Sequence, residues 1–160
     1  MSKAFTRESD SESAQDSVPR RRLAGTANGL ITAAGAQRFR QELAQLIEQR
    51  RAAGDSAGGA LQPRIRELQE LLQSSIVASL PADQETIGFG ANVKLRYSNG
   101  EEATFQIVGV DESDPEHDRI CWQSPLAREL TGRRAGEKIR FRAPGGEQDL
   151  EILSVRYFPH

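Results

Sequence analysis

The chain has little of several residue types and patterns on which common protein functions depend. It contains one cysteine, Cys121, and two histidines, so an internal disulfide is excluded and no zinc-ligand spacing is present. No apolar run approaches the roughly 18 residues of a membrane span. The charged residues that follow Met1 lead us to expect no secretory signal. We therefore expect a cytoplasmic protein that has neither a disulfide nor a bound metal.

Patterns that would indicate catalysis or cofactor binding are absent as well. Gly58 and Gly59 are not followed by Lys and Ser or Thr, so the chain has no phosphate-binding glycine loop. His117 lies in the acidic segment 111–119, which is better explained as a solvated loop than as a cation site. We expect no cofactor, and we expect that the chain alone is not an enzyme.

Length and charge limit the architecture. A chain of 160 residues with 37% hydrophobic content builds one ordinary core or two small ones. Its net charge of -2 divides into +1 for residues 1–30, +1 for residues 31–76 and -4 for residues 77–160, so no part is basic enough to bind DNA independently. We interpret residues 1–30, which include the run Arg20-Arg21-Arg22, as a disordered polar tail. A solvated linker explains these arginines better than a nucleic-acid contact does.

Residues 31–78 have the pattern of a short antiparallel helical hairpin. Thr32 is a suitable N-cap, and the first helix is expected to end near Ala53, because residues 54–59 (GDSAGG) favour a turn. A second helix is expected from about Leu61, with Pro63 in its first turn. The apolar residues recur at helical spacing on each segment: Phe39, Leu43, Leu46 and Ile47 on the first, and Leu61, Ile65, Leu68 and Leu72 on the second.

Residues 79–86 are expected to be a linker, after which residues 87–160 have the period of β-strands. Strands are predicted at 91–97, 103–110, 120–122, 137–142 and 150–157, and a short helix is predicted to begin at Ser124 and Pro125. The predicted domain is a twisted antiparallel sheet with one short helix against it. Together with the hairpin, this gives an α+β fold.

Several segments of the second half, in this order and spacing, resemble the GreA/GreB family of transcript-cleavage factors. They are residues 89–93 (FGANV), 105–109 (FQIVG), 124–132 (SPLARELTG), 144–147 (PGGE) and Tyr157. The resemblance implies an FKBP-like carboxy-terminal domain preceded by a helical coiled coil. It also implies that the partner is bacterial RNA polymerase, bound at the rim of its secondary channel. Contact with nucleic acid would then be indirect, through the elongation complex, and no membrane is involved.

The resemblance also suggests which residues dock on the partner. In the family, the Ser-Pro at the start of the short helix belongs to the docking surface. A helix N-terminus suits an acidic or polar partner group, although Ser124 has a second expected role as the cap of its own helix. A basic cluster of Arg128, Arg133, Arg134, Lys138, Arg140 and Arg142 follows in the sequence, and solvated loops and strand faces explain it almost as well. The expected partner-binding residues are Ser124, Pro125, Leu126, Ala127, Arg128, Arg133 and Arg134.

The hairpin tip departs from the family pattern. Members that stimulate cleavage have Gly-Asp, a two-residue gap, and Glu-Asn at the tip, where the acids help to hold a second metal ion in the polymerase active site. Here Gly54 and Asp55 match, whereas Gly58 and Gly59 stand at the Glu and Asn positions. Asp55 is thus a weak candidate for a tip acid and is better explained as a turn residue. We expect polymerase binding without efficient cleavage, similar to the Rnk-like members that have a short coiled coil.

Two alternatives remain from the sequence. One is a minimal cleavage factor whose missing acid comes from elsewhere, such as Glu48 or Glu67, although both fall on helix bodies away from the tip. The other, from a different class, is a peptidyl-prolyl isomerase, which the FKBP-like fold allows. Such an enzyme needs an aromatic-lined pocket, and most of the aromatic residues are assigned to the core here.

Overall fold

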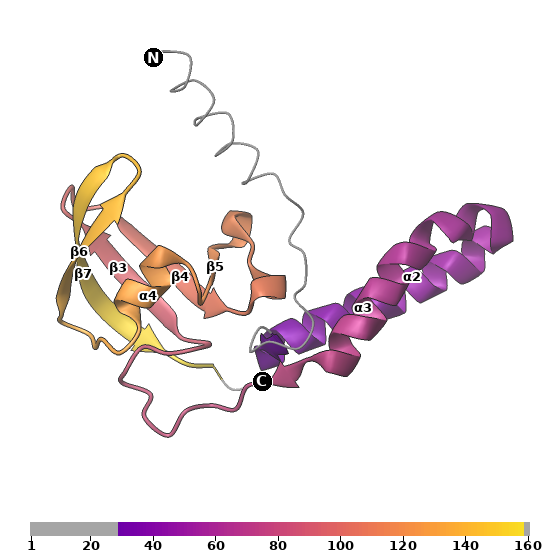
Figure 1. Cartoon of the computed structure of the whole chain (residues 1–160), viewed down its shortest axis with the longest axis horizontal. Coiled ribbons are helices and arrows are strands. Elements are labelled where there is room, and N and C mark those ends of the chain that lie inside the picture. Colours follow the sequence, from indigo (N-terminus) through magenta and orange to yellow (C-terminus); the bar gives the residue numbers. More distant parts are fainter. Residues whose placement is uncertain (1–28, 159–160) are drawn as a thin grey trace, which may run out of the picture.

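The computed structural model describes residues 29–158 and shows a helical hairpin that projects from a β domain (Figure 1). The α+β class and the hairpin expected from the sequence are confirmed. The predicted tail lies outside the described residues, apart from Gly29 and Leu30. No helix within residues 29–158 combines the length and the apolar character that crossing a membrane requires.

The hairpin consists of α2 (Ala33–Gly58), the short 3-10 helix η2 (Gly59–Leu61) and α3 (Gln62–Ser74). Thr32 caps α2 as expected, because its side chain accepts a hydrogen bond from the Gly35 amide at 2.9 Å. The 13 residues of α3 limit the paired length to about 20 Å. The apolar stripes meet between the helices, where Phe39, Leu68 and Leu71 are buried and Leu43, Leu46 and Leu72 pack against them.

The regular part of the first helix ends at Ala53, as expected, and α2 reaches Gly58 through a further helical turn beyond a kink. One residue, Gly54, leaves the helical conformation, with φ 74° and ψ -179°, and the chain then resumes its helical path. Gly58 packs closely on the preceding turn, since a Cβ there would lie 2.7 Å from Cγ of Arg50. Glycine therefore produces a kink and a tight closure at the tip rather than an open loop.

The foot of the hairpin is closed by two short strands that the sequence analysis did not predict. β1 (Leu30–Ile31) pairs in parallel with β2 (Ile76–Val77). A period-two signal needs about four residues to be recognised, so strands of this length leave no pattern. The pairing joins the two ends of the hairpin.

The β domain is a five-stranded sheet of order β5-β4-β3-β7-β6. Its strands are β3 (Asn92–Tyr97), β4 (Glu102–Val108), β5 (Arg119–Cys121), β6 (Lys138–Ala143) and β7 (Gly146–Arg156). The expected all-antiparallel pairing is wrong at one edge, where β5 runs parallel to β4. The intervening segment carries the chain back along this edge through two 3-10 helices, η3 (Val110–Glu112) and η4 (Pro115–His117). The short helix α4 (Pro125–Leu130) covers one face of the sheet, and its Ala127 and Leu130 are fully buried in the core.

Candidate functional site

The hairpin and the β domain are joined by a buried carboxylate, Glu112, whose side chain is 0% exposed. It accepts hydrogen bonds from the Thr32 amide at 2.8 Å, from the Thr32 hydroxyl and from the Gly109 amide at 3.0 Å. Arg38 from α2 adds a guanidinium nitrogen at 3.3 Å. The carboxylate thus lies at the start of α2, where the helix dipole favours negative charge.

Two glycines allow this joint to close. A Cβ at Gly35 would lie 1.8 Å from Oε1 of Glu112, and a Cβ at Gly109 would lie 2.2 Å from the carbonyl oxygen of Leu30. The joint was not expected from the sequence, because Glu112 falls in a segment predicted to be a solvated acidic loop. The one sign of the joint in the sequence was the helix cap Thr32, and its partner Glu112 lies 80 residues away.

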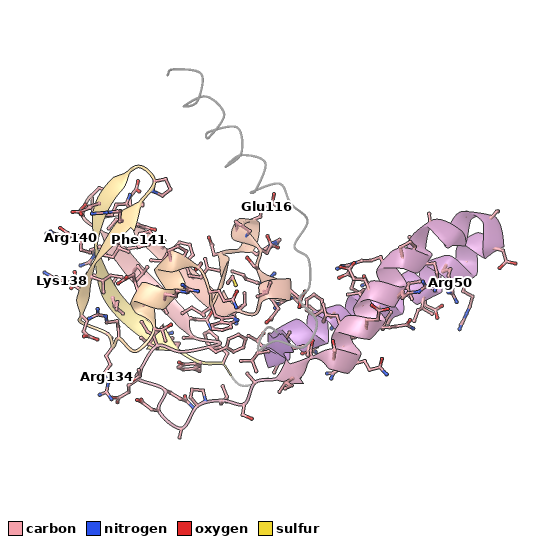
Figure 2. The ribbon with its side chains drawn as sticks, viewed as in Figure 1. Arg50, Glu116, Arg134, Lys138, Arg140 and Phe141 are labelled. Carbon is pink, nitrogen blue, oxygen red and sulfur yellow. The ribbon has the colours of Figure 1, made fainter. Side chains whose placement is uncertain are left out.

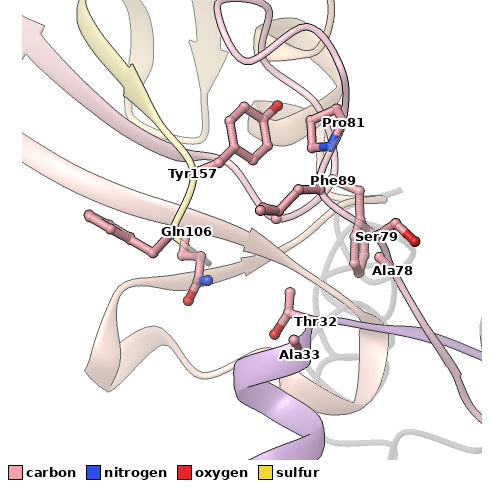
Figure 3. Close-up of a pocket in the computed structure, with 11 residues that line it drawn as sticks. Thr32, Ala33, Ala78, Ser79, Pro81, Phe89, Gln106 and Tyr157 are labelled. Atoms are coloured by element: carbon pink, nitrogen blue, oxygen red, sulfur yellow. The ribbon is translucent and has the colours of Figure 1, made fainter. Parts of the chain in front are cut away.

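Beside the joint lies a pocket of about 240 Å³, shown in Figure 3. Phe89, Tyr157 and Phe158 contribute to its lining together with residues of the hairpin foot such as Thr32 and Ala78. The sequence left few aromatic residues to line a pocket, and three of them lie together here. The Tyr157 hydroxyl donates to the Thr86 carbonyl oxygen at 2.8 Å, and burial raises the pKa of this phenol.

The predicted docking residues at α4 divide into exposed and structural ones. Ser124 caps the helix, with its side chain accepting from the Ala127 amide at 3.2 Å, and Pro125 occupies the first turn. Pro125 and Arg128 are exposed and Leu126 is half-buried, whereas Ala127 is fully buried. Ala127 therefore packs in the core, and the exposed surface of α4 is formed by neighbours such as Pro125 and Arg128.

The predicted basic cluster is largely engaged within the chain. Arg134 approaches Asp83 at 3.4 Å and Glu85 at 3.6 Å, and its Nε donates to the Thr86 hydroxyl at 3.2 Å. These contacts hold part of the predicted linker against the segment after α4. Figure 2 shows Arg134 at the lower edge of the β domain, apart from Lys138 and Arg140.

The other arginines of the cluster differ in their pairing. Arg133 lies 3.9 Å from Glu137, and on β6 Arg140 and Arg142 pair with acidic residues of β7. Within residues 29–158, Arg128 and Lys138 have no ion pair. Their charges are therefore the least compensated in the cluster.

The hairpin tip carries little acid. Asp55 is exposed and lies beside Arg50 and Arg51 around an open hollow of about 610 Å³. Arg50 donates to the Gln62 side chain, and Figure 2 shows it near the far end of the hairpin. No group of three His, Cys, Asp or Glu residues in the described part of the chain is arranged to hold a metal ion.

The two other acids considered for the tip are engaged on the helix bodies. Glu48 pairs with Arg51 at 3.3 Å, and Glu67 pairs with Arg64 at 2.9 Å. Neither lines the hollow at the tip. The tip therefore presents one carboxylate and two guanidinium groups.

Comparison with known proteins decides the family. The family model described as "Transcription elongation factor, GreA/GreB, C-term" matches residues 82–157. Transcription elongation factor GreB of Neisseria meningitidis serogroup A is 36% identical over 151 residues, which cover 79% of this chain and 93% of that protein. The chain belongs to the GreA/GreB family of transcription elongation factors.

Other Gre proteins align over a similar extent. GreB of Pseudomonas aeruginosa is 35% identical over 161 residues and covers 86% of this chain and 95% of the relative. Among solved structures, GreA factor homolog 1 of Thermus thermophilus matches 79% of this chain and 97% of that chain, at 22% identity and a TM-score of 0.42.

Proposed function

We propose that this Gre-family factor binds bacterial RNA polymerase at the rim of the secondary channel and regulates elongation without efficient stimulation of transcript cleavage. In this proposal the carboxy-terminal domain, with the FKBP-like arrangement that the family resemblance implies, is the docking module. The chain acts by binding the polymerase, and any RNA cleavage is performed by the polymerase itself. The hairpin then enters the channel.

The docking surface of this proposal is the exposed start of α4. Pro125 and Arg128 are exposed there, and Ser124 fixes the helix start that presents them. Arg128 has no ion pair within residues 29–158, so its charge is available to an acidic partner group. Ala127 and Arg134, which are also among the expected docking residues, support this surface from the core and from the segment after α4, where Arg134 pairs with Asp83.

The composition of the hairpin tip is the observation that supports the proposed lack of efficient cleavage stimulation. Mg²⁺ prefers several oxygen ligands, and the tip offers the single carboxylate of Asp55 next to Arg50 and Arg51. Positive charges at this position oppose the binding of a second metal ion. Gly58, at the position of the family's Glu, has no space for a side chain.

The test measures polymerase binding and RNA cleavage on backtracked elongation complexes of the cognate polymerase. We expect the wild type to bind and not to stimulate cleavage, and we expect Ser124→Glu and Arg128→Glu to bind weakly. Ser98→Glu, in the exposed turn after β3, is the matched control for the first change and should bind normally. Because Ser124 is also a helix cap, thermal unfolding of Ser124→Glu is measured in parallel.

Two outcomes would contradict the proposal in different ways. Cleavage that depends on Asp55, lost in Asp55→Ala, would show that the chain is a minimal cleavage factor. Absence of binding by the wild type would remove the polymerase docking altogether.

The aromatic pocket at the hairpin foot makes prolyl isomerisation worth testing in the same preparation. We expect no acceleration of peptide isomerisation. The pocket is small, it is shared with the hairpin, and Phe158 on its rim is 52% exposed, so it does not enclose a proline side chain as such an enzyme requires.

A further inference from the structure

One face of the sheet carries a row of polar side chains with an excess of hydrogen-bond donors. α4 and the core occupy the other face. The strand register places four residues side by side across β7, β3, β4 and β5, because Asn92 is paired with both Arg156 and Gln106, and Gln106 is paired with Arg119. Neighbours across paired strands project from the same face. We refer to Arg156, Asn92, Gln106 and Arg119 as the basic row.

The basic row meets the start of α2 at an open pocket of about 400 Å³. Asn92, Gln106 and Arg119 line it from the sheet, and Arg38 lines it from the hairpin. This pocket is separate from the predicted docking residues at α4 and from the tip. Its walls come from both parts of the molecule, so it forms only when they are joined.

One donor in the pocket is buried without an acceptor. The Nδ2 atom of Asn92 is inaccessible to solvent and has no hydrogen-bond partner. An amide N–H group buried in this way destabilises the fold, so such groups are rare unless a ligand or water satisfies them. An acceptor in the pocket would satisfy this amide once the Asn92 side chain turns toward it.

Two guanidinium groups add positive charge at the same place. Arg38 and Arg119 each have an ion pair, to Glu112 at 3.3 Å and to Asp114 at 3.6 Å, and each pair uses only part of the five N–H donors of a guanidinium. Burial and, after it, the charge of Arg119 lower the pKa of Arg38, which indicates that the two cations repel each other. An anion between them would relieve this repulsion.

We propose that Arg38 and the three members of the basic row that line the pocket, Asn92, Gln106 and Arg119, bind a small phosphate-bearing molecule. Phosphate offers several acceptor oxygens in a geometry that the planar guanidinium fork matches. The pocket, of about 400 Å³, has room for a phosphate group with a small substituent. Asp118 also lines the pocket, and its negative carboxylate repels an anion. This residue therefore lowers the affinity for phosphate.

The test titrates inorganic pyrophosphate into the whole chain and follows heat or backbone amide shifts. This inference does not depend on the polymerase proposal, because binding is measured without a polymerase. We expect saturable binding that Arg119→Gln weakens roughly tenfold, since a hydrogen bond to a charged group is lost. Asp118→Asn should bind more tightly. Arg142→Gln, an exposed arginine on β6 that lies outside the pocket lining, is the matched control and should not change affinity.

A second variant tests the buried amide separately from the charge. Asn92→Ala removes the unpartnered donor, so it should weaken pyrophosphate binding without lowering the midpoint of urea unfolding. A clear loss of stability would show that the Asn92 side chain serves the fold itself and is not held ready for a ligand. Absence of pyrophosphate binding, an equal effect of Arg142→Gln, or binding of an RNA oligonucleotide in place of pyrophosphate would each overturn the proposal.

Discussion

The two ends of the hairpin are built on opposite principles. At the foot, the carboxylate of Glu112 is buried and accepts hydrogen bonds from Thr32, Gly109 and Arg38. At the tip, Asp55 is exposed and glycines surround it. The chain therefore fixes the direction of the hairpin with many interactions and leaves few chemical groups at its end. This contrast suits an arm that occupies a site rather than one that supplies catalytic ligands.

The largest expected effect comes from removing the carboxylate at the foot. Glu112→Ala leaves the amides of Thr32 and Gly109 and the guanidinium of Arg38 without their acceptor. Leaving a buried hydrogen-bond donor without its acceptor costs about 1–3 kcal/mol for each donor. Urea unfolding followed by circular dichroism measures the change. If the midpoint does not move, the joint contributes little to stability and the comparison between foot and tip fails.

A surface glutamate is the control for that change. Glu102 pairs with Lys94 at 2.7 Å and with Arg96 at 3.3 Å, but it is exposed. Exposed ion pairs contribute little because water and salt screen them. Glu102→Ala should therefore leave the midpoint nearly unchanged.

The next effect concerns the space at the joint. Gly35→Ala introduces a Cβ that would lie 1.8 Å from Oε1 of Glu112, so the carboxylate must move away from its donors. We expect a loss of about 2–3 kcal/mol in the free energy of unfolding. In Gly35→Ala/Glu112→Ala the clash is absent, so the double variant should be no less stable than Glu112→Ala alone. Additive losses in this cycle would show that Gly35 acts independently of Glu112.

Features that depend on residues close together in the sequence were predictable, and features that depend on distant residues were not. The hairpin, its cap at Thr32 and the short helix at Ser124 follow from residues within a few positions of one another, and each was predicted. The joint depends on two residues 80 positions apart, and a single glutamate in an acidic segment gives no sign of burial. The parallel pairing of β5 was likewise missed, because strand direction is set by the path of the connection and not by side-chain period.

The candidate site shows the same limit. The sequence named Ala127 and Arg134 as docking residues, but it did not reveal that one is buried and the other is paired with Asp83. The residue types around α4 were predictable from their order alone. Their exposure depends on which face of the helix meets the sheet, and this is set by packing between segments far apart in the chain.

A smaller effect is expected at the tip. Gly54 has φ 74°, a conformation that L-residues with a Cβ disfavour, so Gly54→Ala should cost about 1–2 kcal/mol. Gly59→Ala is the matched control, because Gly59 has φ -61° and open space at the Cβ position. Thermal unfolding compares the two. Equal melting temperatures would mean that the tip can relax into a different turn and that its kink is not specified by Gly54.

The smallest expected effect is the pH dependence of the contacts that hold the segment before β3. The Thr86 hydroxyl, which donates to Asp83 at 2.6 Å, is the largest cause of the lowered pKa of this carboxyl, followed by the Glu85 amide. The lowered pKa means that the ionised form stabilises the fold above about pH 4, and this contribution is lost as pH falls through the folded-state pKa. Asp83→Asn should therefore be slightly less stable than the wild type at neutral pH, and the difference in urea midpoint should shrink in acid. A gap for Asp83→Asn that persists at low pH would assign the effect to packing rather than to charge.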